Sequence, residues 1–503
     1  MAARPRHAVA RAPRRRARRG RRRRRRRGAR PGRRRGAVTA RRRGPRVALA
    51  AALAVALLGA GADAARAARR HAPAGGDALS RALREAAPGD TVVAGAGVHH
   101  GSFRVAAPIV LAGEPGATLH GGGRGTVLTV VAGGAVVSDL EVRGSGARVL
   151  TVDAGIHVVK AARVVVRRVR VRDVLYGIYG ERAAALAVED CDLAGRVPPL
   201  KEDGEGNGIH LWYSDDPRLA RNTVAGFVDG VYLSFVHRAE LTGNRLQDCG
   251  RYGLHTMYCQ DTRLVENLFT RSVAGCAIMF TNRLHVERND FFRNRGPRTY
   301  GLLLRDCSAG RFQDNRFVDN TVAIFFDNSN RNRFAGNLIE DNGWGILMFA
   351  SCAGNEVAGN TFVNNDYPVA LDMRRTDNRF DDGARGNYWS EAAPYDLDGD
   401  GVSDAPHGPV NAFSFLSKQY PDLSVLAKSP AVAALGVAER VMPALRPSEA
   451  VDRFPAVRPA RTRGTGAPLA RAGAGGPAPA AAAAFGLLAL AGLGGLAAAR
   501  RTP

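Results

Sequence analysis

Histidine and methionine side chains recur in neighbouring segments of the chain, where they could bind a soft metal ion. His255 and Met257 stand two residues apart, Met279 follows 22 residues after Met257, and His210 lies upstream in a similar segment. Imidazole nitrogen and thioether sulfur together form a donor set suited to Cu(I). The sequence therefore predicts a candidate copper site at these four residues, provided that the fold brings their segments together.

A second group of candidate ligands lies in a short acidic segment near residue 400. Four aspartates around Gly401 are spaced as positions 1, 3, 5 and 9 of an EF-hand-type calcium loop: Asp396, Asp398, Asp400 and Asp404. His407 stands where such a loop has a bidentate glutamate, and the sequence indicates no flanking helices. Two interpretations stay open, a structural Ca²⁺ site and an ion-free polar turn that caps the domain.

A repeat of about 22 residues organises the segment that holds these residues. A short apolar strand recurs from Gly155 to Gly345 at intervals of 22, 31, 22, 23, 22, 26, 22 and 22 residues. Asparagines recur in phase with it: Asn222, Asn244, Asn267, Asn289, Asn315, Asn337 and Asn360. The period is too short for two helices and fits one coil of a parallel β-helix. We expect an all-β, right-handed, single-stranded parallel β-helix of about a dozen turns over residues 66–395, with asparagines stacked at one corner.

Alternation along each strand predicts which side chains face outward. Counting from the opening glycine, positions 1 and 3 are nearly all apolar, as in Ile209 and Leu211, and should fill the interior together with Leu254 and Thr256. Positions 2 and 4 should face out: His210, Trp212, Tyr232, His255, Met257, Met279 and Arg305. Strands about 4.8 Å apart would place Met279 beside Met257, whereas His210 would lie about 10 Å from His255.

The outward face thus has two compatible interpretations. Apolar outward residues often mark a protein docking patch, for which Trp212, Tyr232 and Arg305 are the candidate contact residues. The histidine and methionines would instead form a transient copper site. Both hold if a copper donor docks there, and the insertions at 196–207 and 295–299 would help to build the binding face.

The N-terminal end differs in composition from the repeat. The net charge is +27, yet residues 1–46 contain 23 arginines and no Asp or Glu, so the basicity belongs to a leader and no nucleic-acid partner is expected. The apolar segment 47–60, followed by small residues, is typical of a secretory signal peptide. We therefore expect residues 1–65 to be an Arg-rich leader and signal peptide, and the body to be exported.

The C-terminal end is predicted to follow the β-helix in four parts. These are the Asp-rich capping loop at 396–408, a partly helical extension at 409–460, a flexible linker at 461–479 and a transmembrane tail anchor at 480–503. Residues 480–499 are apolar and uncharged, and Arg500 and Arg501 follow on the expected cytoplasmic side. Disordered Ala/Gly filler and a cleaved sorting tail remain alternatives to the anchor.

Several segments in consistent order carry a family resemblance. They are residues 206–212 (GNGIHLW), 251–258 (RYGLHTMY), 277–279, 300–306, 386–390 and 395–404. They resemble NosD, a family of periplasmic maturation proteins of nitrous-oxide reductase, over about residues 76–455. Thr256 departs from the pattern, since an aromatic residue is expected between His255 and Met257.

The resemblance implies a part in an ABC-type assembly machine at the outer face of the cytoplasmic membrane. NosD stands on the permease NosY, driven by the ATPase NosF, and helps the copper chaperone NosL to supply the copper–sulfur centre of nitrous-oxide reductase. Residues 409–460 would then contact the permease. The histidines and methionines named above fall in recurring segments of the family, which does not by itself make them copper ligands.

Two rival functions are weighed against this one. A polysaccharide lyase or epimerase acting on uronate polymers needs carboxylates and a positioned base on the outward strands. We expect only Arg305 and Asp327 to remain in the outward columns, and acids do not follow Tyr252-Gly253, so we expect no enzyme. A passive surface-layer or adhesion solenoid is the third alternative.

Overall fold

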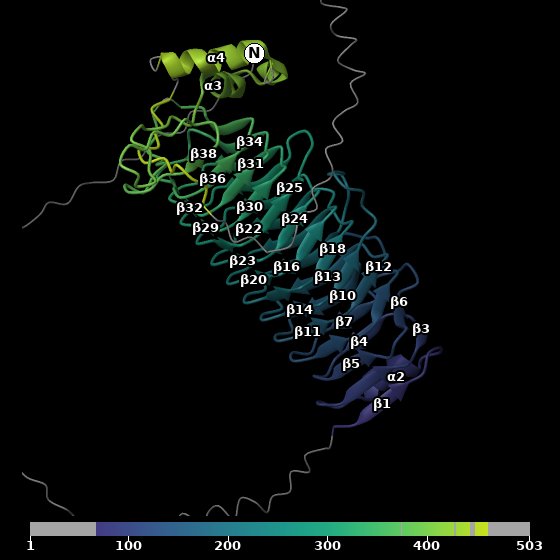
Figure 1. Cartoon of the computed structure of the whole chain (residues 1–503). Coiled ribbons are helices and arrows are strands. Elements are labelled where there is room, and N and C mark those ends of the chain that lie inside the picture. Colours follow the sequence, from purple (N-terminus) through teal and green to yellow (C-terminus); the bar gives the residue numbers. More distant parts are fainter. Residues whose placement is uncertain (1–66, 374, 427–428, 443–447, 461–503) are drawn as a thin grey trace, which may run out of the picture. The chain divides into compact units, whose positions relative to one another are not determined.

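The computed structural model of the protein describes residues 67–373, 375–426, 429–442 and 448–460. In these residues three parallel sheets of thirteen, twelve and thirteen strands wind around a common interior (Figure 1). For example, β22 (Tyr252–Met257) pairs in parallel with β19 (Asp229–Ser234) one coil before it and with β25 (Ala274–Met279) one coil after it. The predicted all-β parallel β-helix is confirmed, with about as many coils as expected.

One of the three sheets, here called the site sheet, carries the predicted outward residues. Its strands are β4 (Phe103–Val105), β7 (Leu128–Val130), β10 (Ala154–Val159), β13 (Tyr176–Glu181), β16 (Asn207–Trp212), β19, β22, β25, β28 (Tyr300–Arg305), β31 (Val322–Asp327), β34 (Trp344–Met348) and β37 (Tyr367–Leu371). The second sheet runs from β1 (Arg69–Ala72) and β2 (Thr91–Ala94) to β35 (Glu356–Val357). The third runs from β3 (Gly97–His100) to β38 (Tyr388–Trp389).

Alternating side chains fill the interior of the coils with apolar groups. Ile209 and Leu211 of β16 and Leu254 of β22 are fully buried and belong to one continuous core. Thr256 is buried on the same side of β22, where its hydroxyl lies 3.1 Å from that of Thr281. The predicted direction of the alternation is therefore correct. All six cysteines are also buried, and none forms a disulfide.

Asparagine side chains join successive coils at one corner. Each amide nitrogen donates to the side-chain oxygen of the next asparagine at 2.8–3.0 Å, along Asn222, Asn244, Asn267, Asn289, Asn315, Asn337, Asn360 and Asn387. A second ladder links Asn294, Asn320, Asn342 and Asn365 in the same way. The predicted ladder is confirmed. Because a buried amide without a partner is destabilising, these ladders favour one register of the coils.

Both ends of the solenoid are closed by other parts of the chain (Figure 1). Helix α2 (Ala78–Glu85) covers the first coils with Leu79 and Leu83. At the last coil, the buried carboxylate of Asp452 accepts hydrogen bonds from the backbone N–H of Asn387 at 2.7 Å and from the indole N–H of Trp389 at 2.8 Å. The returning C-terminal segment thereby provides hydrogen-bond partners for polar groups of the last coil, where no following coil is present to bind them.

The C-terminal extension is partly helical, as predicted. It contains α3 (Ala412–Gln419), the 3₁₀ helix η1 (Pro421–Leu426) and α4 (Pro430–Val441). The side chains of Asn411 and Ser429 cap α3 and α4 by accepting from backbone N–H groups of their first turns. Phe413 of α3 stacks on Tyr367 of β37 with ring centroids 5.5 Å apart.

Several predicted segments lie outside the described residues. They are the leader and signal peptide at 1–65, the linker at 461–479 and the tail at 480–503. Among the helices that the structure does describe, none is long and apolar enough to cross a membrane.

The asparagine ladder generates a first prediction. In Asn289→Ala, the buried carbonyl of Leu264 and the amides of Asn267 and Asn315 lose a partner. We expect the free energy of unfolding to fall by roughly 2–4 kcal/mol, since each unsatisfied buried group costs about 1–3 kcal/mol. Urea unfolding followed by circular dichroism measures it. Gln313→Ala, at an exposed position of β29 (Arg311–Gln313), should change it by less than about 0.5 kcal/mol; equal effects would contradict a stabilising role for the ladder.

Candidate functional site

The strand register brings part of the predicted copper set together on the outward face of the site sheet. Met257 pairs with Met279 across β22 and β25, and His255 lies two residues before Met257 on the same face. His210 is two coils away, because it pairs with Tyr232, which in turn pairs with His255. The structure therefore groups His255 with the two methionines and leaves His210 apart.

Tyrosine rings enclose both histidines. His255 lies between Tyr232 and Tyr252, with ring centroids at 4.6 and 5.1 Å, and its side chain is only 8% exposed. His210 lies between Tyr179 and Tyr232, at 4.4 and 4.6 Å. His255 faces outward as expected, yet its imidazole is buried, because neighbouring rings cover what the strand geometry turns outward. Burial of the His210 imidazole lowers its pKa to about 4.

A buried carboxylate lies against His255. Asp229 is completely buried, and its Oδ2 is 3.1 Å from His255 Nδ1. Arg251 binds the same carboxylate through Nε at 3.0 Å and Nη2 at 2.6 Å. Burial alone would raise the pKa of Asp229, but the hydrogen bonds from His255 and Arg251 outweigh it and hold the pKa below its usual value.

The sequence analysis missed Asp229 for a geometric reason. A Cβ placed on Gly230 would lie 2.6 Å from the carbonyl oxygen of Gly253 and 3.0 Å from Sγ of the buried Cys249, so the glycine position faces inward, as the next residue does. Two successive inward positions break the alternation and turn the residue before the glycine outward, here Asp229 before Gly230. The expectation that only Arg305 and Asp327 supply charge on this face is therefore wrong.

A second feature missed from the sequence is a stack of rings at the surface, three exposed and one (Phe235) half-buried, here called the aromatic column. Tyr213, Phe235, Tyr258 and Phe280 each follow an outward position 4, and their ring centroids lie 4.7, 5.0 and 4.8 Å apart. All four have positive φ, from 47° to 56°. The signal was present in the sequence, as an aromatic residue at position 5 of four consecutive strands.

Two of the three predicted contact residues, Trp212 and Arg305, border this surface. The guanidinium of Arg182 lies 5.4 Å from the centre of the Trp212 ring, and Trp212 contacts Tyr213 at 5.0 Å. Arg305 pairs with Asp327 at 2.9 Å in the next coil. Tyr232 is not at the border, since its ring lies between the two histidines.

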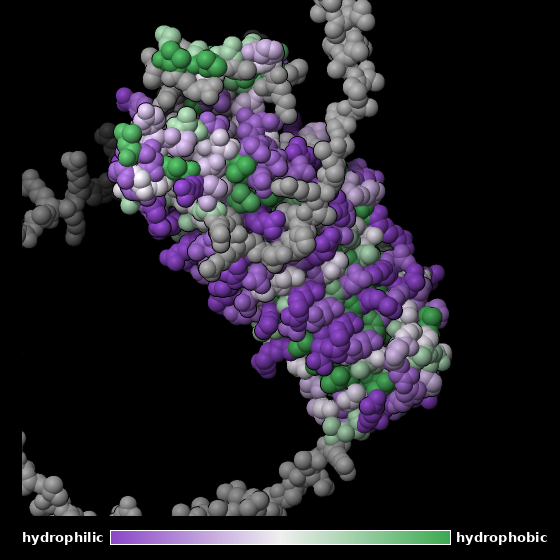
Figure 2. Space-filling view, in the orientation of Figure 1, coloured by the Kyte–Doolittle hydropathy of each residue, from purple (hydrophilic) through white to green (hydrophobic). Residues whose placement is uncertain are grey.

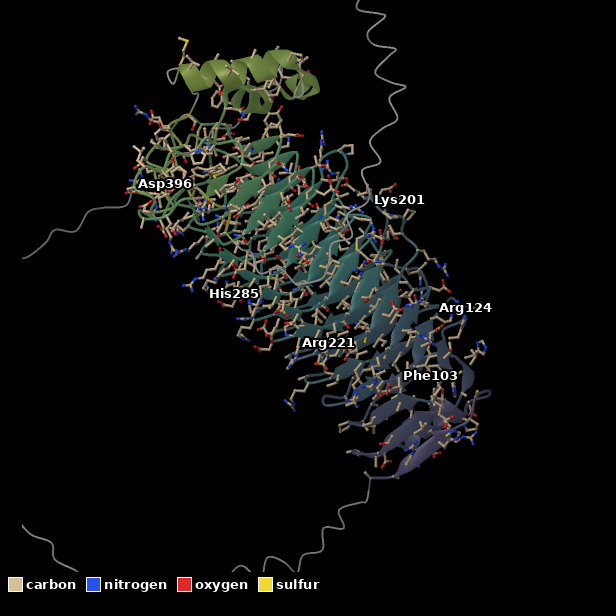
Figure 3. All side chains as sticks on the ribbon, in the orientation of Figure 1. Phe103, Arg124, Lys201, Arg221, His285 and Asp396 are labelled. Atoms are coloured by element: carbon tan, nitrogen blue, oxygen red, sulfur yellow. The ribbon has the colours of Figure 1, made fainter. Side chains whose placement is uncertain are left out.

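The insertion at 196–207 folds back over neighbouring coils. The backbone N–H of Leu200 donates to the carbonyl of Cys249 at 3.3 Å, and Lys201 extends from the side of the solenoid (Figure 3). Burial raises the pKa of Tyr252, and the charge of Glu202 in this insertion adds a smaller contribution in the same direction. The insertion therefore lies near the outward face, close to Tyr252.

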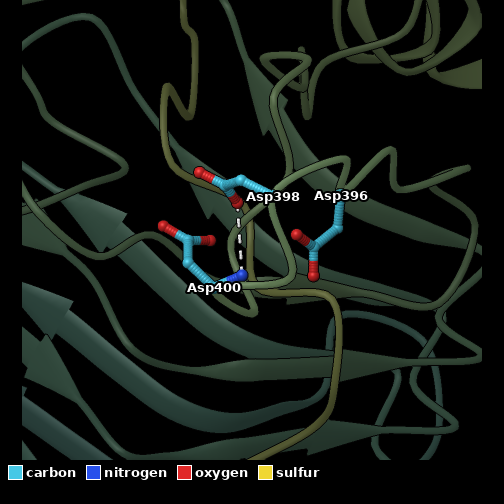
Figure 4. A group of neighbouring side chains, drawn as sticks. All are labelled: Asp396, Asp398 and Asp400. Atoms are coloured by element: carbon cyan, nitrogen blue, oxygen red, sulfur yellow. Dashed lines mark hydrogen bonds between the residues drawn. The ribbon is translucent and has the colours of Figure 1, made fainter.

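Three of the four predicted calcium ligands converge. Asp396, Asp398 and Asp400 offer carboxylate oxygens that all lie within 4.8 Å of one another (Figure 4). Asp404 instead accepts the backbone N–H of Leu397 at 2.7 Å. His407, at position 12, packs on Trp389 with ring centroids 5.3 Å apart. The loop geometry thus resembles the first half of a calcium loop without its closing residue.

Comparisons with known proteins identify the family. A family model described as "Periplasmic copper-binding protein (NosD)" matches residues 193–393. A Pseudomonas aeruginosa protein named "Probable ABC transporter binding protein NosD" is 32% identical over 378 residues, which cover 72% of this chain and 87% of the relative. The chain belongs to the NosD family. A relative of the same name from Stutzerimonas stutzeri is 29% identical over 377 residues, covering 72% of this chain and 85% of that protein.

Solved structures resemble this NosD-family chain in fold alone. The A-module of the Azotobacter vinelandii mannuronan C-5 epimerase AlgE4 matches with a TM-score of 0.50 and 16% identity, covering 58% of this chain and 92% of that one. At this identity the likeness extends to the β-helix and not to its chemistry.

The donor atoms of this NosD-family protein fit a copper ion of the kind the family description names. His255 Nε2 is buried and finds no hydrogen-bond partner among the described residues. Beside it on the same face lie the thioethers of Met257 and Met279, which cannot satisfy a polar group by donating to it. Soft sulfur and imidazole donors prefer Cu(I), and a metal ion would satisfy the orphaned nitrogen.

Proposed function

We propose that this NosD-family protein supports copper delivery and copper–sulfur cluster maturation of nitrous-oxide reductase, as the periplasmic component of an ABC-type assembly machine. The observation that carries the proposal is the unpartnered His255 Nε2 beside Met257 and Met279 on one outward face. The copper-binding description of the family and the names of the relatives support the role. Copper is cargo in this proposal, and the chain itself is not an enzyme.

The proposed ligand set suits transfer rather than storage. One imidazole and two thioethers are neutral donors, so they hold Cu(I) without the charge that a thiolate would add. The cysteines offer no competing site, because all six are buried and burial raises the pKa of Cys249, for example, to about 12. Copper would therefore pass over the outward face and not enter the interior.

The aromatic column supports docking of a protein on the same face. Tyr258 and Phe280 directly follow Met257 and Met279 in the sequence, so a partner that reaches the sulfurs also covers these rings. Aromatic and methionine side chains with charged neighbours are typical of the centre of protein interfaces. We propose that the copper chaperone NosL or the apo-reductase docks here, with Trp212 and Arg305 as flanking contacts.

The backbone of the aromatic column favours a role beyond stability. Equivalent corners of other coils hold Asp306 and Asn328, also at positive φ, and short polar residues tolerate this conformation best. Bulky rings are strained there, although stacking offsets part of the strain. Tyr258 and Phe280 are also 45% and 36% exposed, so these rings gain only part of the stabilisation that full burial would provide.

The helical extension would contact the membrane partner. Val437, Val441 and Met442 at the end of α4 are 52%, 76% and 56% exposed, and hydrophobic side chains are visible on the helices in Figure 2. We propose that residues 409–460 bind the permease NosY, which the ATPase NosF drives, and that residues 480–503 anchor the chain in the cytoplasmic membrane. Contiguous exposed apolar groups are typical of such contacts.

A uronate lyase or epimerase is the second candidate, because of one observation. Asp229 and His255 are arranged as a carboxylate that orients an imidazole base. The flanking phenols do not favour it: burial raises the pKa of Tyr232 and Tyr252, so these groups stay protonated at neutral pH. Release of unsaturated uronates from alginate or pectate by the purified protein would establish the lyase instead.

The copper site generates a second prediction. In the full chain, Met257→Leu, Met279→Leu and His255→Gln should each raise the Kd for Cu(I) at least about tenfold, because each removes one soft donor while keeping most of the volume. Competition with a chromophoric Cu(I) chelator measures this Kd. Met348→Leu, at a methionine buried inside β34, is the matched control and should leave it unchanged. Unaltered binding in all three outward variants would rule out this ligand set.

The docking face generates a third prediction. A strain without this chain should produce a reductase that lacks its copper–sulfur centre and keeps its electron-transfer copper. Complementation with the double variant Phe235→Asn, Tyr258→Asn should fail, because the rings are lost while asparagine tolerates the positive φ. Lys160→Asn at an equivalent corner should complement. The copper content of reductase purified from each of the three strains measures the outcome. A wild-type copper content in the deletion strain would favour a passive solenoid.

We further propose that the acidic loop binds a structural Ca²⁺ ion, which generates a fourth prediction. Ca²⁺ should raise the melting temperature of the chelator-treated protein, because it neutralises the clustered carboxylates of Asp396, Asp398 and Asp400. Asp398→Asn with Asp400→Asn should abolish this shift, and Asp203→Asn, at an exposed site in the insertion, should retain it. If Ca²⁺ has no effect on the wild type, the loop is an ion-free polar turn.

A further inference from the structure

Two histidines in one column of the site sheet have different neighbours at Nδ1. His255 Nδ1 is 3.1 Å from the carboxylate oxygen Oδ2 of Asp229, whereas His210 Nδ1 is 3.1 Å from the amide nitrogen Nδ2 of Asn207. Asn207 and Asp229 are themselves paired in the register of β16 and β19. The same position of two adjacent strands therefore offers an acceptor to one histidine and a donor to the other.

We infer that Asp229, held by Arg251, is a positioning residue that fixes the His255 tautomer able to bind Cu(I), while Asn207 fixes the opposite tautomer of His210 and excludes it from the site. The inference rests on the proposed function and goes beyond it, because it selects one of the two histidines. It assigns roles to Asp229, Arg251 and Asn207, none of which is a proposed metal ligand.

The tautomer of His255 follows from hydrogen-bond chemistry. An ionised carboxylate only accepts, so Nδ1 must carry the proton that bridges to Asp229. A neutral imidazole has one N–H, and Nε2 therefore keeps a free lone pair. This is the nitrogen that finds no partner among the described residues. Histidine ligands of metals commonly have their other nitrogen bound to a carboxylate in this way.

Arg251 fixes the carboxylate. Its Nε and Nη2 contact both oxygens of Asp229, at 3.0 and 2.6 Å, and a bidentate pair defines the orientation of both planes. The guanidinium also lies 5.0 Å from the centre of the Tyr252 ring, and that ring contacts His255 edge-on. The imidazole is thus held at Nδ1 by a hydrogen bond and at its faces by Tyr232 and Tyr252.

The opposite assignment holds for His210. The side-chain oxygen of Asn207 accepts the backbone N–H of Asp229 at 3.3 Å, which turns its amide nitrogen toward His210. An amide N–H₂ only donates, so His210 Nδ1 must accept and Nε2 must carry the proton. A protonated Nε2 cannot ligate a metal. The ring of Tyr232 also separates this histidine from His255.

The proton positions can be measured without copper, which makes the fifth prediction. In the ¹⁵N-histidine spectrum of the full chain, one of whose eleven histidines is His255, we expect an unprotonated Nε2 for His255 and an unprotonated Nδ1 for His210. His255→Gln and His210→Gln assign the two signals. Asn207→Asp should move the proton of His210 to Nδ1, and this variant removes no buried charge pair.

Copper binding then tests the consequence. Asp229→Ala should release the Nδ1 proton of His255 and raise the Kd for Cu(I) about 10–100-fold, the usual range for loss of such a partner. Asp381→Ala is the matched control, because Asp381 is also a buried carboxylate in a bidentate pair, with Arg453, at the far end of the solenoid. It should leave both the tautomer and the Kd unchanged.

The outcomes separate this inference from the proposed function. A protonated Nε2 of His255 in the wild type, or a Kd equal in Asp229→Ala and Asp381→Ala, would overturn the positioning role even if the methionine variants lose copper. The expected tautomers together with no Cu(I) binding at all would overturn the copper role instead. The expected tautomers with selective loss of binding in Asp229→Ala support both.

Discussion

Register between successive coils is the constraint on which the rest of this structure depends. Backbone hydrogen bonds set the spacing of the coils, and the buried asparagine ladders from Asn222 to Asn387 and from Asn294 to Asn365 fix which residues lie above one another. A shift by one residue would break these ladders and turn the apolar positions outward. Any residue type that recurs at one position of the repeat therefore becomes a continuous column.

The outward face is built from such columns. One column alternates phenol and imidazole rings through Tyr179, His210, Tyr232 and His255, and the next carries the thioethers of Met257 and Met279. The aromatic column runs beside them. A regular surface of this kind suits a partner protein that lies across several coils and reaches a few soft donor atoms.

The buried charge on this face comes from a break in the regular pattern. The buried carboxylate of Asp229 needs the partly exposed Arg251 as its partner, since removing that partner would leave an uncompensated charge. A buried charge of this kind is often no more stabilising than apolar side chains would be. The pair therefore indicates a role other than stabilising the fold. Its contact with His255 Nδ1 suggests that this role is to orient the histidine. The glycine that forces the break is in this sense part of the site.

The sequence by itself determined the coil. The 22-residue period, the recurring asparagines and the alternation of Leu254 and Thr256 with His255 and Met257 are local patterns, and parallel stacking is the arrangement that satisfies them all. Only the tertiary structure decided which outward residues act together. Asp229 reaches His255 because a glycine breaks the alternation, Tyr232 separates His210 from His255, and Asp404 turns from the other aspartates to the loop backbone. These outcomes depend on side-chain packing and hydrogen bonds between coils, which a one-dimensional pattern does not specify.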